Sequence, residues 1–294
     1  MRVVEPHQFN KIKHKRKKKH LPRATLLIPI LLTAGVLAYV FYGQELVHKP
    51  GTNGTPSDSD ESSQSVSPPS SQQLSLKRFS DKQFKELYTS FAYPNTQPLT
   101  EAPAITGNEV ADDRIQRLAE ARGYVLSAVP VSNIVKIDEP YLTDDDLLQQ
   151  NAKIGWDGLS EAADKAGVPL QITSAYRSIE LQRSLFLSRM RNAGITENGV
   201  ADGYSDEAIN RVMNEVAPPG YSRHHNGYTI DLACDGVGLH GFKNTSCYEW
   251  ISKDNFKAAK QHGWVPGYPE EASGQGPRPE PWEFIWVGTL QLYE

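Results

Sequence analysis

Hydrophobic residues in this chain form one unbroken run near the amino terminus and a series of short periodic groups further on. The run is ATLLIPILLTAGVLAYVFYG, residues 24–43, twenty positions without a charged side chain. A helix of about 20 apolar residues can cross a bilayer, so this run predicts a transmembrane anchor. A cleaved signal peptide is the competing interpretation. However, the run is longer than the usual signal core, and no small-residue cleavage site follows it before Gln44 and Glu45.

The periodic groups predict both helices and strands. In PLQITSAY, residues 169–176, apolar and polar positions alternate, which predicts a strand. Thr143 and the three aspartates after it predict the start of a helix that continues to Gly167. The other elements expected are helices at residues 79–93, 112–124, 178–193, 205–216 and 254–262, and strands at residues 124–131, 228–233 and 282–287. Helices come first and strands cluster late, which favours an α+β fold.

Composition divides the chain into five parts. Residues 1–23 are a basic tail, which is expected to be cytoplasmic because positively charged flanks stay on that side of a membrane span. After the anchor at 24–43, residues 44–78 form a spacer, most of which is too poor in apolar side chains to fold. Residues 79–106 are a connecting segment to which the sequence assigns no function. Residues 107–294 are expected to form the extracytoplasmic domain.

Charge and cysteine usage narrow the possible partners. The first 23 residues hold nine Lys or Arg and one acid, which leaves 22 bases and 34 acids, a net charge of −12, for the rest. Such an acidic exterior argues against nucleic acid and against tight binding to anionic lipid. Cys234 and Cys247 are the only cysteines and lie beyond the predicted span, where disulfides persist. A disulfide between them is expected, with a thiol pair or a metal role left open.

A histidine and an aspartate flank the strand predicted at residues 228–233. In YTIDL the strand period places Asp231 on the face opposite the apolar residues. His224 precedes the strand, and Asn226 and Gly227 supply a turn that can bring its ring towards Asp231. Imidazole and carboxylate are zinc ligands, although a simple hydrogen-bonded pair is the commoner arrangement.

A second segment changes this interpretation. PEPWEFIWVG, residues 279–288, brings two glutamates to the start of another apolar strand. With the spacing Ser-x-His-x-x-Gly-x-x-x-Asp at residues 222–231, it resembles the VanY-type D-alanyl-D-alanine carboxypeptidases, zinc peptidases related to lysostaphin and the amino-terminal domain of sonic hedgehog. ITSAYRSIELQ at 172–182 and FKAAKQHGWVPGYP at 256–269 are similar to further blocks of that family. The resemblance covers about residue 145 to the carboxyl terminus, and several ordered blocks are more specific than one motif.

The resemblance implies a fold and a set of roles. The fold is a small antiparallel sheet that carries the metal cleft and is packed with helices. His224 and Asp231 are implied as zinc ligands and Glu280 as the general base. Arg177 would polarise the scissile carbonyl or hold the substrate. The lesser substrate-binding candidates are Gln182, Ser174 and Ser222.

One position departs from the family pattern. The family has Glu-x-x-His, with the histidine as third zinc ligand, where this chain has Glu283. Either Glu283 is the third ligand, or His225 or His240 replaces it, or no catalytic metal binds and the cleft only recognises stem peptides. In the first case two carboxylates and one imidazole neutralise a dication. Such a centre should be a weaker Lewis acid than the family's, and manganese or iron should compete better with zinc.

The implied function is hydrolysis of D-alanyl-D-alanine, or of a nearby bond in the peptidoglycan stem, by metal-activated water. The expected partner is the stem peptide, and the expected location is the cell membrane, with one span and the peptidase domain outside. A non-catalytic peptidoglycan-binding module is the alternative, and a hedgehog-like domain with a structural metal is a third. The motifs do not distinguish a carboxypeptidase from an endopeptidase.

Overall fold

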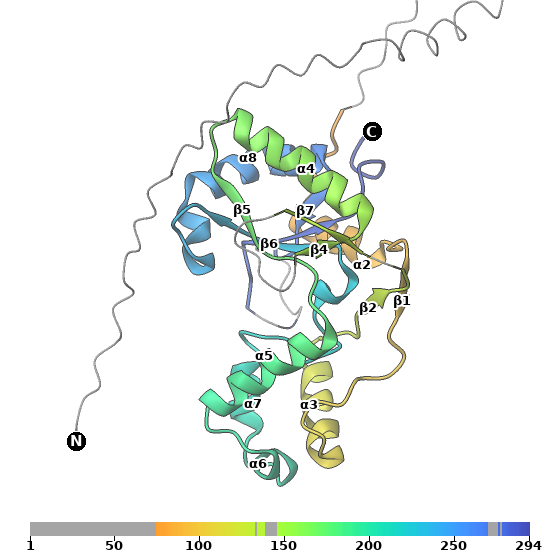
Figure 1. Ribbon diagram of the computed structural model, residues 1–294, viewed down its shortest axis with the longest axis vertical. Coiled ribbons are helices and arrows are strands. Elements are labelled where there is room, and N and C mark those ends of the chain that lie inside the picture. The colour runs from red at the N-terminus through yellow and green to blue at the C-terminus, as the bar shows by residue number, and fades with distance from the viewer. Residues whose placement is uncertain (1–74, 133, 139–145, 270–275, 277) are drawn as a thin grey trace, which may run out of the picture. The chain divides into compact units, whose positions relative to one another are not determined.

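A four-stranded antiparallel sheet carries the candidate site (Figure 1). In this computed structural model, the residues described are 75–132, 134–138, 146–269, 276 and 278–294. The strand order is β5-β6-β8-β7. The strands are β5 (Leu170–Ser174), β6 (Thr229–Cys234), β7 (Trp264–Pro266) and β8 (Glu283–Trp286). The predicted strands at 169–176, 228–233 and 282–287 are therefore confirmed, and the fold is α+β.

One face of the sheet packs against two long helices, α4 (Gln150–Lys165) and α8 (Ser246–Gln261) (Figure 1). Ile230 and Leu232 of β6 are fully buried in this core, beside Trp156 and Leu159 of α4. Because side chains alternate along a strand, Asp231 points to the opposite face. The amphipathic pattern of β6 thus separates the core from the polar side of the sheet.

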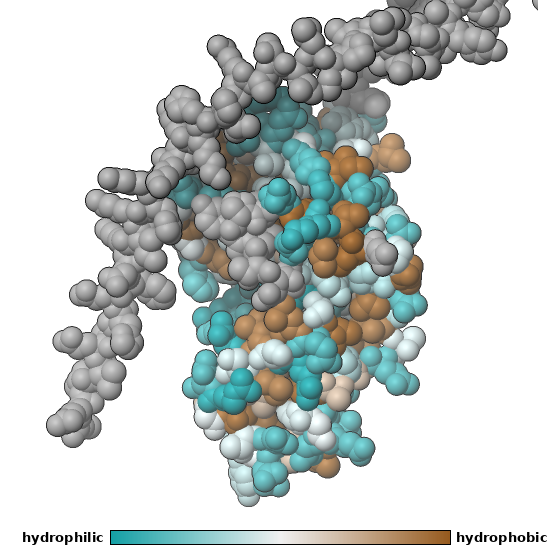
Figure 2. All heavy atoms as spheres, in the orientation of Figure 1, coloured by the Kyte–Doolittle hydropathy of each residue, from teal (hydrophilic) through white to brown (hydrophobic). Residues whose placement is uncertain are grey.

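A second group of helices has its own core. It comprises α3 (Glu109–Ala121), α5 (Ile179–Asn192), α6 (Glu197–Ala201) and α7 (Asp206–Val212), gathered in the lower part of Figure 1. Ser178 caps α5 by accepting a hydrogen bond from the backbone N–H of Leu181. Hydrophobic and hydrophilic residues are interspersed over this part in Figure 2. The loop between β5 and α5 carries Arg177 from the sheet to the helical group.

The segment upstream of residue 107 is part of this fold. The helix predicted at 79–93 is confirmed as α2 (Asp81–Ser90), which begins with a capping box between Ser80 and Gln83. Phe84 and Tyr88 of α2 are buried in a cluster with residues of β7 and β8. Downstream, β1 (Thr96–Pro98) pairs with β2 (Ala128–Pro130). The strand predicted at 124–131 is thus shorter than expected.

One helix starts later than predicted, and another follows a break in the backbone. The helix expected from Thr143 starts later, at α4, because β4 (Leu147–Leu148) pairs with β3 (Val135–Lys136). Thr143 itself lies outside the described residues. The helix expected at 254–262 is the second part of α8, because the backbone of Lys253–Phe256 is not helical. A separate helical segment lies before this break, and the side chain of Thr245 caps it by accepting from the N–H of Tyr248.

No helix within the described residues is both long enough and apolar enough to span a membrane. The anchor predicted at 24–43 lies outside those residues, as do the basic tail and nearly all of the spacer.

Cys234 at the end of β6 and Cys247 in the first turn of α8 form a disulfide. Both cysteines are buried. The disulfide therefore joins the central strand to the helix that covers it, and this confirms the first of the three roles considered for these residues.

We expect removal of this disulfide in a C234S/C247S variant to lower the free energy of unfolding by roughly 3 kcal/mol, because closing a short loop restricts the unfolded chain. Urea unfolding of the variant and the oxidised protein would measure the difference. Reduced wild-type protein serves as control and should unfold at a urea concentration close to that of the variant. Equal midpoints for the oxidised protein and the variant would contradict the prediction.

Candidate functional site

The register of the sheet aligns three polar side chains. Asp231 in β6 is directly opposite Glu283 in β8 and also opposite Ser174 in β5. Residues opposite one another on neighbouring strands project from the same face. The sheet therefore holds two buried carboxylates and a hydroxyl in one row, although 52 residues separate Asp231 from Glu283 in the sequence.

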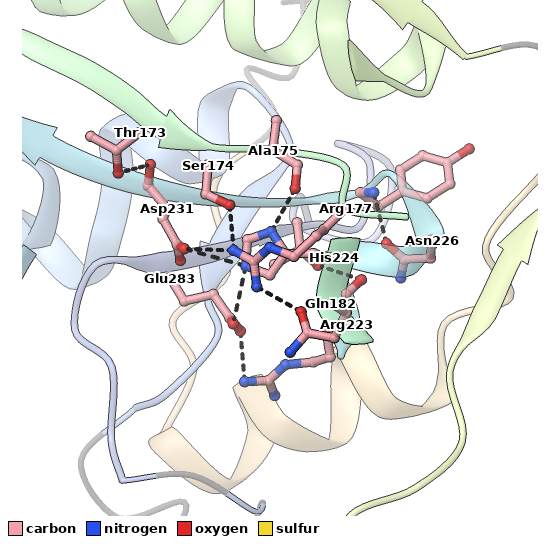
Figure 3. Close-up of polar contacts among 12 residues, drawn as sticks. Thr173, Ser174, Ala175, Arg177, Gln182, Arg223, His224, Asn226, Asp231 and Glu283 are labelled. Carbon is pink, nitrogen blue, oxygen red and sulfur yellow. Dashed lines mark hydrogen bonds and ion pairs between the residues drawn. The ribbon is translucent and has the colours of Figure 1, made fainter. Parts of the chain in front are cut away.

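His224 reaches this row from a turn before β6. It lies in the short 3-10 helix η1 (Arg223–Asn226), which ends at Gly227 with a left-handed φ of 76°. Nδ1 of His224 donates a hydrogen bond to the carbonyl oxygen of Ala175 at 2.6 Å (Figure 3). Nε2, the other ring nitrogen, lies 3.4 Å from Oδ2 of Asp231 and 3.7 Å from Oε2 of Glu283. The contact with Ala175 therefore orients the ring with Nε2 towards the carboxylates.

These three side chains suit a divalent cation. One ligand atom from each of His224, Asp231 and Glu283 can be chosen so that all lie within 4.8 Å of one another, and all three residues are buried. Oδ1 of Asp231 is buried and has no hydrogen-bond partner among the described residues. One imidazole and two carboxylates form a donor set that binds zinc, and the oxygens also suit manganese or iron.

Glu280 adds a third acid close to the cluster. It lines a cavity of about 1500 Å³, together with Arg177, Gln182, Ser222, His240 and Trp282. Burial, and then the charges of Glu283 and Asp231, raise the pKa of Glu280 to about 9. Burial also raises the pKa of Glu283, and Arg223 opposes that rise. Ionised together these acids repel one another, and a divalent cation would relieve that repulsion.

Two neighbouring side chains hold Arg177 next to Asp231. Its Nη2 donates to Oγ of Ser174 at 2.6 Å, and its Nη1 donates to Oε1 of Gln182 at 2.9 Å. Gln182 is fixed in turn, because its Nε2 donates to the carbonyl oxygen of Ala217 at 2.6 Å. Nη2 of Arg177 lies 3.9 Å from Oδ2 of Asp231. Ser174 and Gln182 thus orient Arg177 in this arrangement, while Ser222 is a buried residue of the cavity wall.

The two other histidines considered as third ligands lie outside the cluster. In His225, Nε2 accepts from the N–H of Gly220 at 3.0 Å and Nδ1 donates to the carbonyl oxygen of Arg177 at 2.6 Å. Both of its ring nitrogens are therefore engaged. His240 is exposed and meets the ring of Trp282 edge-on, with 5.3 Å between the ring centroids. The structure therefore favours Glu283 over either histidine.

Sequence reasoning missed Arg223, which forms an ion pair with Glu283. Nη2 of Arg223 lies 2.6 Å from Oε1 of Glu283 (Figure 3). Its guanidinium carbon lies 4.1 Å from the ring centroid of Tyr268 and 5.4 Å from that of Tyr88 in α2. A basic residue directly before His224 was the available signal. No local pattern indicates the 3-10 turn that directs Arg223 into the site.

The fold and site together define a small α+β domain with a buried His-Asp-Glu cluster on its sheet, next to a large cavity. Residues 145–289 match the family model of VanY, D-alanyl-D-alanine carboxypeptidase. This part of the chain belongs to the VanY-type family.

Similar proteins include a D-alanyl-D-alanine carboxypeptidase of Enterococcus faecalis, which is 27% identical over 170 residues, or 56% of this chain and 53% of the relative. The chain thus spans about half the length of that relative. Among solved structures, the LdcB LD-carboxypeptidase is 21% identical with a TM-score of 0.42, covering 54% of this chain and 67% of the other. A vancomycin-resistance D,D-pentapeptidase VanY in complex with Zn(II) is 23% identical with a TM-score of 0.38, covering 55% and 83%.

We expect His224→Ala to abolish tight zinc binding, because among the described residues His224 is the one imidazole that faces the two carboxylates. His240→Ala is the matched control. It removes a histidine from the wall of the same cavity and should leave one equivalent of zinc bound. Elemental mass spectrometry of the purified full-length variants would measure the metal. Loss of zinc from the His240→Ala protein alone would contradict this assignment.

Proposed function

We propose that this chain is a metal-dependent peptidase that releases D-alanine from the peptide stems of peptidoglycan. The observation that carries the proposal is the buried cluster of His224, Asp231 and Glu283, with Glu280 and Arg177 in the same cavity. The VanY-type family and the carboxypeptidase activity named for the Enterococcus faecalis relative support D-alanyl-D-alanine as substrate. In this proposal Glu283 is the third ligand.

A divalent cation bound by the cluster would supply a Lewis acid that polarises the scissile carbonyl and acidifies a water molecule. In this proposal Glu280 accepts the proton of that water. Its raised pKa reflects burial together with the charges of Glu283 and Asp231. Once those two charges are compensated, part of the cause disappears and Glu280 is returned towards the ionised form that a general base requires.

Arg177 supplies a cation next to Asp231. Its guanidinium, fixed by Ser174 and Gln182, can stabilise either the developing oxyanion or the free carboxylate of the stem peptide. Water contributes its hydroxyl to the scissile carbonyl carbon. The proton accepted by Glu280 passes to the nitrogen of the leaving D-alanine, so the hydroxyl and the proton of the water molecule both end in the products.

The proposed location is the outer face of the cell membrane. The run at residues 24–43 would anchor the chain, and the basic residues before it would keep the amino terminus in the cytoplasm. The polar spacer would let the peptidase domain reach nearby cell wall. Fusion of reporters for cytoplasmic and external location to each end of the chain tests this orientation.

We expect Glu280→Gln to lower kcat by about 10²- to 10⁴-fold while zinc stays bound, because it removes the proton acceptor and keeps the side-chain shape. The assay is release of D-alanine from a synthetic stem pentapeptide ending in D-alanyl-D-alanine. Glu249→Gln, an exposed glutamate of α8, is the matched control and should retain wild-type kcat. A zinc-loaded wild-type protein that binds the peptide without releasing D-alanine would contradict the proposal and favour a binding-only module.

A further inference from the structure

The two oxygens of the Glu283 carboxylate face different partners. Oε1 lies 2.6 Å from Nη2 of Arg223, while Oε2 faces Nε2 of His224 at 3.7 Å. The Glu283 side chain is buried, with 4% exposed, and that of Arg223 is half-buried, with 22% exposed. The arginine thus leaves one oxygen of this carboxylate directed at the candidate metal position.

The surroundings of this ion pair keep Arg223 charged and in place. Burial lowers the pKa of Arg223, but Glu283, Tyr268, Tyr88 and Glu280 together outweigh burial and raise it, with Glu283 contributing most of these four. The rings of Tyr268 and Tyr88 flank the guanidinium. At Gly267 a Cβ would come within 2.6 Å of Oε1 of Glu283, so the absence of a side chain there leaves room for the carboxylate. Tyr88 comes from α2, upstream of the residues that match the family model.

We propose that Arg223 is a positioning residue, and that the Arg223–Glu283 pair takes the place of a neutral third ligand. The inference rests on the proposed metal-dependent function. With two carboxylates and one imidazole alone, a divalent centre would be electrically neutral. The guanidinium of Arg223 returns the site to a single positive charge, which is the charge left by two imidazoles and one carboxylate. The ligand residues alone would leave a neutral centre, and Arg223, which is not a ligand, adds one positive charge.

The Arg223–Glu283 ion pair also predicts the effect of replacing Glu283 by histidine. Glu283→His would restore the family's ligand type but take from the half-buried Arg223 the carboxylate that lies 2.6 Å away, and leave the guanidinium next to a dication. Losing the partner of a poorly solvated charge is destabilising. In this chain Glu283→His is therefore expected to lower stability and Zn²⁺ affinity unless Arg223 is replaced at the same time.

The experiment is a double-mutant cycle on the full chain with E283H, R223Q and the E283H/R223Q double variant. Zn²⁺ affinity is measured by competition with a chromophoric chelator, and melting temperature is measured on metal-free protein. We expect E283H to bind Zn²⁺ about 10- to 100-fold more weakly than wild type. We also expect it to melt about 6 °C lower or more. R223Q in the same chain should recover most of both losses.

A matched control is E283H/R177Q, which removes a different cation from the same cavity. Arg177 contacts Asp231 and Ser174, so its loss should not restore the melting temperature. An E283H protein that binds Zn²⁺ and melts like wild type overturns the proposal. It is also overturned if R223Q fails to rescue E283H, or if R177Q rescues it equally well.

The cycle remains informative if the proposed reaction fails. Zn²⁺ affinity and melting temperature do not depend on turnover, whereas the reaction is tested by release of D-alanine from the wild-type protein. Coupling between positions 223 and 283 without D-alanine release would support the pair and reject the peptidase. D-alanine release without coupling would support the peptidase and reject the pair.

Discussion

The pairing of Asp231 with Glu283 across β6 and β8 is the constraint on which the site depends. Like charges directly opposite each other in a sheet are unfavourable, and both carboxylates are buried. The surrounding structure compensates them with cations from different parts of the chain: Arg223 from η1 and Arg177 from the loop after β5. Burying two carboxylates side by side lowers the stability of the fold. This part of the sheet therefore serves cation binding rather than stability.

Around this pair, each supporting contact fixes the orientation of one side chain. Ala175 selects the nitrogen of His224 that faces the carboxylates, and Arg223 selects the oxygen of Glu283 that does so. Ser174 and Gln182 hold Arg177 on the cavity side of Asp231. The proposed ligands are thus oriented by rigid elements and second-layer hydrogen bonds, the arrangement that tunes metal affinity in proteins. The segment before residue 107 takes part as well, because Tyr88 contacts Arg223.

Local patterns were sufficient for most of the elements and for part of the site. Alternation predicted β5 and β6, an apolar segment predicted β8, and the turn at Asn226 and Gly227 predicted that His224 approaches Asp231. Periodicity could not reveal that β6 pairs with β8, or in which register, because this depends on contacts between distant segments. The same limit explains β4, where Leu147 and Leu148 pair with β3 instead of starting a helix. It also explains Arg223, whose direction is determined by a 3-10 turn that no local pattern indicated.

The central claim is that one imidazole and two carboxylates form the metal site of this chain. X-ray absorption spectroscopy of the zinc-loaded full chain tests it most directly, because scattering from imidazole rings reports how many histidines coordinate the ion. We predict the signature of a single imidazole, with oxygen donors making up the rest of the shell, and loss of the bound zinc in an Asp231→Ala protein. A shell with two imidazoles would contradict it, since His225 or His240 would then have to replace Glu283.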